Sequence, residues 1–212
     1  MKKIDTTLYF ITDSTGLTEN EFLNKVEAAL EGGVTLLQLR EKDRTTREYL
    51  RLAEKVHALA KQYDVPLIID DRIDVAMAVH AEGVHLGQSD MPVKTARSIV
   101  GEDMIIGATT KTVPQALEAE ESGADYLGVG AIYPTTTHVK TVITPVSVLD
   151  DICAAVKIPV NAIGGLKADN VAVLEHCDIS GICVVSAIMK AGDPTVAAKE
   201  LLVKAKQLRK RI

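Results

Sequence analysis

The chain has 212 residues, of which 47% are hydrophobic and 25% are charged, an ordinary balance for a globular protein. With 24 basic and 29 acidic residues, its net charge of −5 argues against nucleic acids and anionic membranes as partners. A small anionic substrate remains compatible with this charge, because a few local cations can reverse the field inside a pocket.

The sequence gives no sign of export or membrane insertion. The N-terminal stretch MKKIDTTLYFITD lacks the apolar core of a signal peptide, and no stretch approaches the roughly 20 apolar residues of a membrane helix. The three cysteines, Cys153, Cys177 and Cys183, show no CxxC spacing. We therefore expect reduced thiols in a cytoplasmic protein, without a disulfide or a zinc site. The chain has no Trp and only 3% aromatic residues, which disfavours a base-stacking surface.

Short apolar runs rich in β-branched residues alternate with longer segments along the whole chain. In chain order the runs are residues 7–13, 35–41, 66–71, 83–87, 104–110, 126–131, 159–165 and 181–187. Near-continuous apolar runs of this length are typical of parallel strands that are buried on both faces.

The segments between the runs show helical periodicity. Residues 21–33 and 49–64 repeat their apolar side chains every three or four positions, as helices that cover a sheet do. Gly33 and Gly123 follow such segments, which is the place for a C-terminal helix cap. The longest connection without regular structure is expected from Ala131 to about Ser147.

These alternating units predict an α/β protein, a single (β/α)8 TIM barrel that spans residues 1–212 as one domain. The crossover connections make the strands parallel and the connections right-handed. A doubly wound open sheet is the rival architecture, but eight units in 212 residues favour closure. The sequence has no linker-like region and no repeat beyond the strand–helix unit.

Polar residues recur where the predicted strands end, which in a TIM barrel is the active-site face. In chain order they are Gln38, Arg40, Lys42, Asp70, Asp71, Gln88, Asp90, Thr109, Lys111, Thr135, Thr136, Thr137 and Ser186. Arg40 and Lys42 are two residues apart and point to one face if the strand continues, where both would attract phosphate. Pairing with Glu41 or with the aspartates is the alternative for these two cations.

Three carboxylates, Asp70, Asp71 and Asp90, are expected to converge on one rim. Carboxylates gathered in a pocket repel one another, so a cation is their natural companion, and Mg²⁺ suits an oxygen-rich site that also receives substrate phosphate. For Asp71 alone, a helix N-cap or a salt bridge to Arg72 is equally compatible with the sequence.

A glycine pair, Gly164 and Gly165, follows the seventh run and is expected to precede a helix. Backbone N–H groups there would approach an anion closely, and Ser186 after the eighth run would add a hydroxyl donor. The loops after strands seven and eight recur as the phosphate site of this fold. A tight turn is the alternative explanation for the glycines. His85, inside a predicted strand, is interpreted as a hydrogen-bonded core residue.

The strings LQLREKD, IIDDRIDVAMAVHAEGVHLGQSDMP, GADYLGVGAIYPTTT, AIGG and VVSAI, in this order, resemble the thiamine phosphate synthase family. The combination of an REK strand end, a DR-x-D-x-A stretch and HLGQ-x-D is specific to it. The resemblance implies a transferase that joins an aminopyrimidine methyl diphosphate to a thiazole phosphate with Mg²⁺, releasing pyrophosphate.

The resemblance also implies roles for residues. It gives the diphosphate to Gln38, Arg40 and Lys42, with Asp70 beside them. It gives Mg²⁺ to Asp71 and Asp90. Thr109 would lie near the pyrimidine or the diphosphate, and Arg40, Lys42 and Thr109 would act in catalysis. The thiazole phosphate would be held by Thr135, Thr137, Gly164, Gly165 and Ser186.

Two positions depart from the family pattern. Asp70 stands where the family usually has Asn, and His138 stands where it usually has a Lys that contacts the diphosphate. Lys140, two residues further on, is a candidate to replace that lysine. His138 is counted here as a substrate-binding residue.

The reaction that the resemblance implies is also compatible with the chemistry of these residues. Loss of a neutralised diphosphate leaves a pyrimidinylmethyl cation, and such a step needs positioning and charge stabilisation more than a general base. Two other functions remain open: an isomerase that aromatises a thiazole carboxylate phosphate with a base such as His138, and a non-catalytic thiamine phosphate-binding regulator. The diphosphate and metal residues argue against both. A homo-oligomer is compatible with the sequence.

Overall fold

The computed structural model describes residues 4–135 and 142–209. Within this part of the chain eight parallel strands form a closed barrel in chain order, and β8 pairs with β1 to close it. The strands are β1 (Leu8–Ile11), β2 (Leu36–Leu39), β3 (Leu67–Asp70), β4 (Gly83–Leu86), β5 (Ile105–Thr110), β6 (Tyr126–Gly130), β7 (Val160–Ile163) and β8 (Gly181–Val184). Each predicted apolar run contains one of them, and the predicted (β/α)8 barrel is confirmed.

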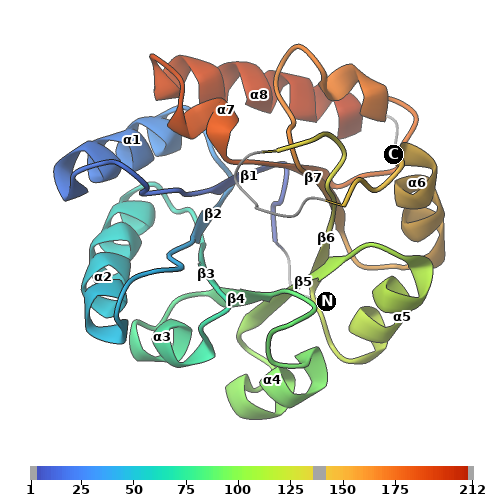
Figure 1. The fold of residues 1–212 in the computed structure, drawn as a ribbon, viewed down its shortest axis with the longest axis horizontal. Helices are drawn as coiled ribbons and strands as arrows, with labels where there is room; N and C mark the ends of the chain where they lie inside the picture. The colour runs from blue at the N-terminus through green and yellow to red at the C-terminus, as the bar shows by residue number, and fades with distance from the viewer. Residues whose placement is uncertain (1–3, 136–141, 210–212) are drawn as a thin grey trace.

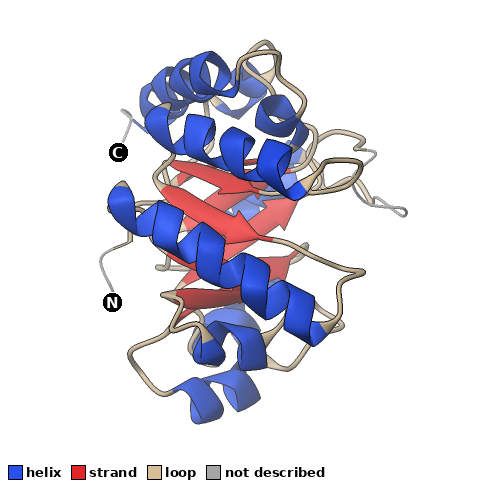
Figure 2. Ribbon diagram, turned by 90° about the vertical axis from the view of Figure 1, so that its left-hand side faces the viewer, coloured by secondary structure: helices blue, strands red, loops and turns tan. Residues whose placement is uncertain are grey.

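A ring of helices surrounds the barrel (Figure 1), and the side view shows the strands running in one direction beneath them (Figure 2). The helices are α1 (Glu19–Glu31), α2 (Thr46–Gln62), α3 (Ile73–Ala78), α4 (Val93–Val100), α5 (Val113–Glu121), α6 (Val146–Ala155), α7 (Ser186–Met189) and α8 (Pro194–Arg209). Their apolar faces pack on the strands, which leaves the carboxyl ends of the strands open for a site.

The first helices begin where the sequence supplies capping side chains. Thr18 and Glu21 form a reciprocal capping box at the start of α1, and Thr45 and Glu48 form another at the start of α2. Gly33, with φ of 94°, follows α1 in the left-handed conformation that a helix end favours. Local sequence therefore determines where α1 and α2 begin and where α1 ends.

The seventh unit differs from the prediction. Only one short 3₁₀ helix, η1 (Val171–Leu174), lies between β7 and β8, so the helix expected directly after Gly164 and Gly165 is wrong. Asn170 explains the difference, because its side chain accepts from the Lys167 N–H at 2.8 Å and donates to the Gly165 carbonyl at 3.0 Å. Such side-chain bonds to the backbone compete with helix formation.

The barrel interior has its own core, separate from the layer between strands and helices. Its apolar members are Tyr9, Ile11, Leu36, Ile68, Tyr126 and Cys183. Polar residues share this interior and are also buried, among them Gln38, Asp70, His85 and Asn161. Side chains therefore fill the barrel, and polar ones become frequent toward the carboxyl ends of the strands.

Two bulk features complete the description. All three cysteines carry free thiols, and Cys177 and Cys183 are buried. Over the described ranges, no helix is both long enough and apolar enough to cross a bilayer.

Candidate active site

A cavity of about 660 Å³ opens at the carboxyl ends of the strands. Its lining comes from every strand of the barrel or from the loop that follows it. The lining residues are Ile11, Gln38, Arg40, Lys42, Asp70, Asp71, His85, Gly87, Gln88, Ser89, Asp90, Thr109, Lys111, Gly130, Ala131, Thr135, Ile163 and Val185. Strand ends far apart in sequence thus converge on one cavity.

Most residues predicted for the site lie in this cavity. Gln38, Arg40, Lys42, Asp70, Asp71, Asp90, Thr109 and Thr135 all line it. Gly164, Gly165 and Ser186 are not among the lining residues, although their chain neighbours Ile163 and Val185 are. Thr137, His138 and Lys140 lie outside the described residues.

The two cations of the β2 end face the aspartates of the β3 end. Lys42 Nζ lies 2.8 Å from Asp70 Oδ2 and also contacts Asp71 Oδ2, while Arg40 Nε lies 3.8 Å from Asp70 Oδ2. Glu41 is turned away and accepts from Ser14 and Arg44 instead. Of the two alternatives for these cations, contact with the aspartates is the one that the structure shows.

Burial and charge shift the pKa values in this cluster. Burial raises the pKa of the Asp70 carboxyl, and repulsion by Asp71 adds to that rise, against the opposing attraction of Lys42 and Arg40. Burial would lower the pKa of the Lys42 ammonium, but the attraction of Asp70 and Asp71 outweighs it and leaves that pKa raised. Lys42 therefore stays a cation, and it lies where it offsets two carboxylates.

Asp71 and Asp90 form a second carboxylate pair beside this lysine. Burial raises the pKa of Asp90, and its hydrogen bond with Asp71 and the Asp71 charge raise it further. Asp90 Oδ2 also accepts from the Gly87 N–H at 2.7 Å, which holds the carboxylate toward the cavity. Two neighbouring carboxylates with mutual repulsion make a site that a hard divalent cation would stabilise.

The two alternative roles for Asp71 are wrong. Arg72 pairs with Asp74 and with Thr46 Oγ1 rather than with Asp71. The N-cap of α3 is Arg72, and no side chain caps this helix. Asp71 has φ of 58°, in the left-handed region, and its N–H donates to the His85 carbonyl at 2.9 Å. This backbone conformation directs Asp71 to the cavity that it lines.

A chain of buried hydrogen bonds crosses the barrel under the cavity. Gln38 Nε2 donates to the Tyr9 hydroxyl at 2.5 Å, and Tyr9 lies 2.7 Å from the Tyr126 hydroxyl. The Tyr126 hydroxyl lies 3.1 Å from His85 Nδ1, and His85 Nε2 lies 2.9 Å from Thr109 Oγ1. Burial lowers the pKa of His85 to about 4, so this ring is neutral near pH 7.

The hydrogen-bond chain contains two residues that the sequence analysis did not single out, Tyr9 and Tyr126. His85 is a hydrogen-bonded core residue as predicted, but it also lines the cavity. In the sequence both tyrosines lie within apolar runs, which indicate a buried strand but no functional role. The available signal was a tyrosine at an inward position of a buried strand, because a buried hydroxyl needs a partner. Lys111 lines the cavity as well, and it had no assigned role.

The opposite side of the rim is made mainly of backbone and apolar side chains. Gly164 has φ of 102° and Gly165 has φ of 64°. A Cβ on Gly164 would lie 2.4 Å from the Ala131 Cβ, and a Cβ on Gly165 would lie 2.7 Å from the Tyr133 Cβ. Backbone conformation and packing thus require both glycines, which supports the tight-turn explanation and leaves the phosphate role untested.

Comparison with known proteins identifies the family. The sequence model described as thiamine monophosphate synthase matches residues 8–188. The chain is 48% identical to a thiamine-phosphate synthase of Methanobrevibacter smithii, covering 95% of this chain and 96% of the relative. It is 49% identical to thiamine-phosphate synthase 2 of Streptococcus pneumoniae, covering 93% and 94%. The chain belongs to the thiamine monophosphate synthase family.

Solved structures agree with this family membership. A thiamine phosphate pyrophosphorylase from Pyrococcus furiosus superposes with a TM-score of 0.87 at 40% identity, covering 95% of this chain and 96% of that one. The 3-hexulose-6-phosphate synthase of Salmonella typhimurium superposes with a TM-score of 0.74, but at 17% identity it shares only the fold. The barrel is therefore shared with other enzymes, whereas the sequence similarity over most of the chain is to the thiamine monophosphate synthase family.

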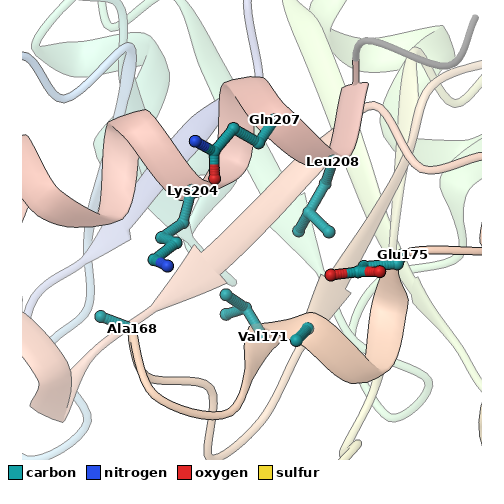
Figure 3. Close-up of a pocket in the computed structure, with 7 residues that line it drawn as sticks. Ala168, Val171, Glu175, Lys204, Gln207 and Leu208 are labelled. Carbon is teal, nitrogen blue, oxygen red and sulfur yellow. The ribbon is translucent and has the colours of Figure 1, made fainter.

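A second cavity, of about 210 Å³, lies outside the barrel where η1 replaces a full helix (Figure 3). Lys204, Gln207 and Leu208 of α8 line one side of it, and Ala168, Val171 and Glu175 line the other. None of the residues predicted for the site lines it. The cavity at the strand ends is therefore the candidate active site.

Proposed function

We propose that this chain is a thiamine phosphate synthase, a cytoplasmic single-domain transferase. It would join 4-amino-2-methyl-5-hydroxymethylpyrimidine diphosphate to 4-methyl-5-(2-phosphoethyl)thiazole, giving thiamine phosphate and pyrophosphate. The observation that carries the proposal is the convergence of Arg40, Lys42, Asp71 and Asp90 in one cavity. Relatives at 48% and 49% identity carry the same name.

The donor set at the rim fits Mg²⁺. Asp71 and Asp90 offer carboxylate oxygens side by side. Among the described residues no group of three or more His, Cys, Asp or Glu side chains could enclose a metal ion. Mg²⁺ commonly takes one or two carboxylates and completes its shell with water and substrate phosphate, so Asp71 and Asp90 would hold it. When bound, it would supply positive charge that neutralises the leaving diphosphate.

Arg40 and Lys42 would receive the diphosphate. The Arg40 guanidinium can hold two phosphate oxygens at once, and the Lys42 ammonium adds a point charge. Lys42 is engaged with Asp70 and Asp71, so binding requires it to exchange carboxylate contacts for phosphate contacts. The contacts of Lys42 with Asp70 and Asp71 therefore compete with the diphosphate for this ammonium.

The reaction then needs no general base. The bond between the pyrimidine methylene carbon and the diphosphate oxygen breaks, and the electron pair leaves with the diphosphate. The resulting cation accepts the lone pair of the thiazole nitrogen, which forms the new carbon–nitrogen bond. No proton is transferred in either step. The cavity's task is to hold two substrates in line and to stabilise charge.

The thiazole phosphate would lie on the side of β7 and β8. Ser186 opens α7, whose N-cap Val185 supplies no capping side chain, so the N–H groups of Ser186 and Ala187 would be the ones offered to an anion, while Ile188 and Met189 donate to the Val185 carbonyl. Gly164 and Gly165 approach from the adjacent loop. Thr135, in the loop after β6, lines the cavity, so it is suited to contact the thiazole phosphate.

A coupled assay tests the proposal. Purified protein with both substrates is expected to release thiamine phosphate and pyrophosphate in equal amounts, and chelation of Mg²⁺ is expected to abolish both. Turnover of a thiazole carboxylate phosphate alone would indicate an isomerase instead. Binding of thiamine phosphate without any turnover would indicate a regulator.

A further inference from the structure

The hydrogen-bond chain under the cavity joins five strands of the barrel. Gln38, His85 and Thr109 line the cavity, whereas Tyr9 and Tyr126 lie below it and are 0% exposed. The two tyrosine rings pack edge to face, with centroids 5.6 Å apart and an interplanar angle of 80°. The tyrosines thus connect cavity residues on opposite sides of the barrel without reaching the substrate space themselves.

Two glycines of the barrel wall, Gly107 and Gly128, leave space for the side chains of the hydrogen-bond chain. A Cβ on Gly107 would lie 2.3 Å from the Tyr126 hydroxyl and 2.5 Å from His85 Nδ1. A Cβ on Gly128 would lie 3.4 Å from His85 Cε1. Neither glycine has the left-handed φ that would itself require glycine. The absence of a side chain at Gly107 therefore serves the contact between Tyr126 and His85.

Counting protons fixes the direction of the chain. The Gln38 amide nitrogen can only donate, so the Tyr9 oxygen accepts from it and the Tyr9 proton goes to Tyr126. The Tyr126 proton then goes to His85 Nδ1, which leaves the imidazole proton on Nε2 to be donated to Thr109 Oγ1. In the reverse order the Tyr9 proton would point at the Gln38 amide nitrogen, which cannot accept it.

We propose that Tyr126, with Tyr9, is a positioning residue that fixes the hydrogen-bond polarity of the cavity floor. At one end of the hydrogen-bond chain, Tyr9 engages the Gln38 amide nitrogen, so the amide oxygen remains as the acceptor of this cavity-lining residue. The other end uses Thr109 Oγ1 as an acceptor, so the Thr109 proton is left as a donor. The floor then presents one acceptor and one donor to a heteroaromatic ring. This inference rests on the proposed function, in which that ring is the aminopyrimidine, and it gives Gln38 to the ring rather than to the diphosphate that the resemblance implies for it.

The test uses Tyr126→Phe, which removes one hydroxyl and keeps the ring. We expect kcat/KM for the pyrimidine diphosphate to fall about tenfold, the order expected from one lost hydrogen bond, while KM for the thiazole phosphate stays within about twofold. Tyr49→Phe is the matched control, because Tyr49 is also buried but its hydroxyl donates to backbone carbonyls outside the hydrogen-bond chain, to Leu39 at 2.7 Å and to Asp70 at 3.5 Å. Equal losses for both substrates, or no loss, would overturn the proposal.

A second measurement needs no substrate. Nitrogen-15 NMR of the histidine rings, with His85 assigned from a His85→Gln spectrum, is expected to show His85 protonated on Nε2 in the wild type. In Tyr126→Phe or Tyr9→Phe, this preference is expected to weaken. Protonation on Nδ1 in the wild type would overturn the proposal even if Tyr126→Phe fails to fold. A wild type without synthase activity but with the Nε2 tautomer would instead overturn the proposed function alone.

Discussion

The two halves of the barrel rim differ in how they are made. The half from β2 to β5 carries charged side chains, with Lys42 between two carboxylates and Asp71 beside Asp90. The half from β6 to β8 offers backbone, small residues and apolar side chains, including Gly130, Ala131, Ile163 and Val185. One half would bind its ligand by charge, and the other by shape and N–H groups.

The difference determines what each half tolerates. Charged rim side chains contribute little to the packed core, so their removal should change binding and leave the fold intact. The glycines of the other half occupy left-handed backbone conformations against packed neighbours, so their substitution should change the fold as well. Substitutions in the β2–β5 half are therefore expected to change activity without changing stability, whereas glycine substitutions in the β6–β8 half are expected to change both.

The largest effect is expected at the carboxylate pair. Asp71→Ala or Asp90→Ala should lower kcat by about a hundredfold or more, because each removes a ligand for the cation that neutralises the leaving diphosphate. Thermal unfolding should change little, since each variant loses one rim contact, that of Lys42 with Asp71 or of the Gly87 N–H with Asp90, but also loses a repulsive neighbour. Steady-state kinetics at saturating Mg²⁺ measure this. Activity within about threefold of wild type in either variant would contradict metal binding there.

The opposite half should respond in stability. Gly164→Ala forces a Cβ into a left-handed residue and to within 2.4 Å of the Ala131 Cβ, and we expect a loss of about 2 to 3 kcal/mol in the free energy of unfolding. Gly192→Ala is the control, because a Cβ there meets nothing within 4 Å. Denaturant unfolding compares the two variants. Equal stability of both would mean that the strand seven turn is not constrained as described.

The same contrast explains what the sequence could predict. Buried strands were predictable because each needs an apolar run, and the charged rim was predictable because Arg40, Lys42, Asp71 and Asp90 lie at the ends of such runs or within three residues after them. Pairing of Lys42 with the aspartates was one of the alternatives that the sequence left open, and only the structure decides for it, because side-chain pairing depends on distances between strands that a sequence does not contain.

Two failures have physical causes as well. The helix expected after β7 is missing because Asn170 bonds to the loop backbone, a choice that propensity alone does not reveal. In the sequence Tyr126 is an ordinary strand residue. Its role depends on contacts of its hydroxyl with Tyr9 on β1 and His85 on β4, which are distant in the sequence. Local pattern predicts elements, whereas networks inside the barrel require the closed structure.

A smaller effect is expected at Ser186. Ser186→Ala should raise KM for the thiazole phosphate about fivefold, the order expected from one hydrogen bond to an anion in a partly exposed site, and should leave KM for the pyrimidine diphosphate unchanged. Initial rates with each substrate varied in turn measure this. Ser98→Ala, on the outside of α4 with its hydroxyl bonded to the Thr95 carbonyl, is the control. Equal changes in both KM values would remove Ser186 from the thiazole phosphate site.

The smallest effect is expected at Asp70, which stands where the family usually has Asn. Asp70 attracts Lys42 at 2.8 Å, and this attraction competes with the diphosphate for the same ammonium. Asp70→Asn keeps the shape and removes the charge, so Lys42 should be released more easily and KM for the pyrimidine diphosphate should fall about threefold.

Stability should change little in Asp70→Asn, because burial already disfavours the charged Asp70 carboxylate and Lys42 keeps Asp71 as a partner. Asp74→Asn is the matched control, since it also removes one carboxylate charge but from an exposed pair with Arg72. Both variants should be compared at low and moderate salt, because exposed charges are screened more than buried ones. A rise in KM for Asp70→Asn would mean that Asp70 holds Lys42 in its binding position rather than competing with the substrate for it.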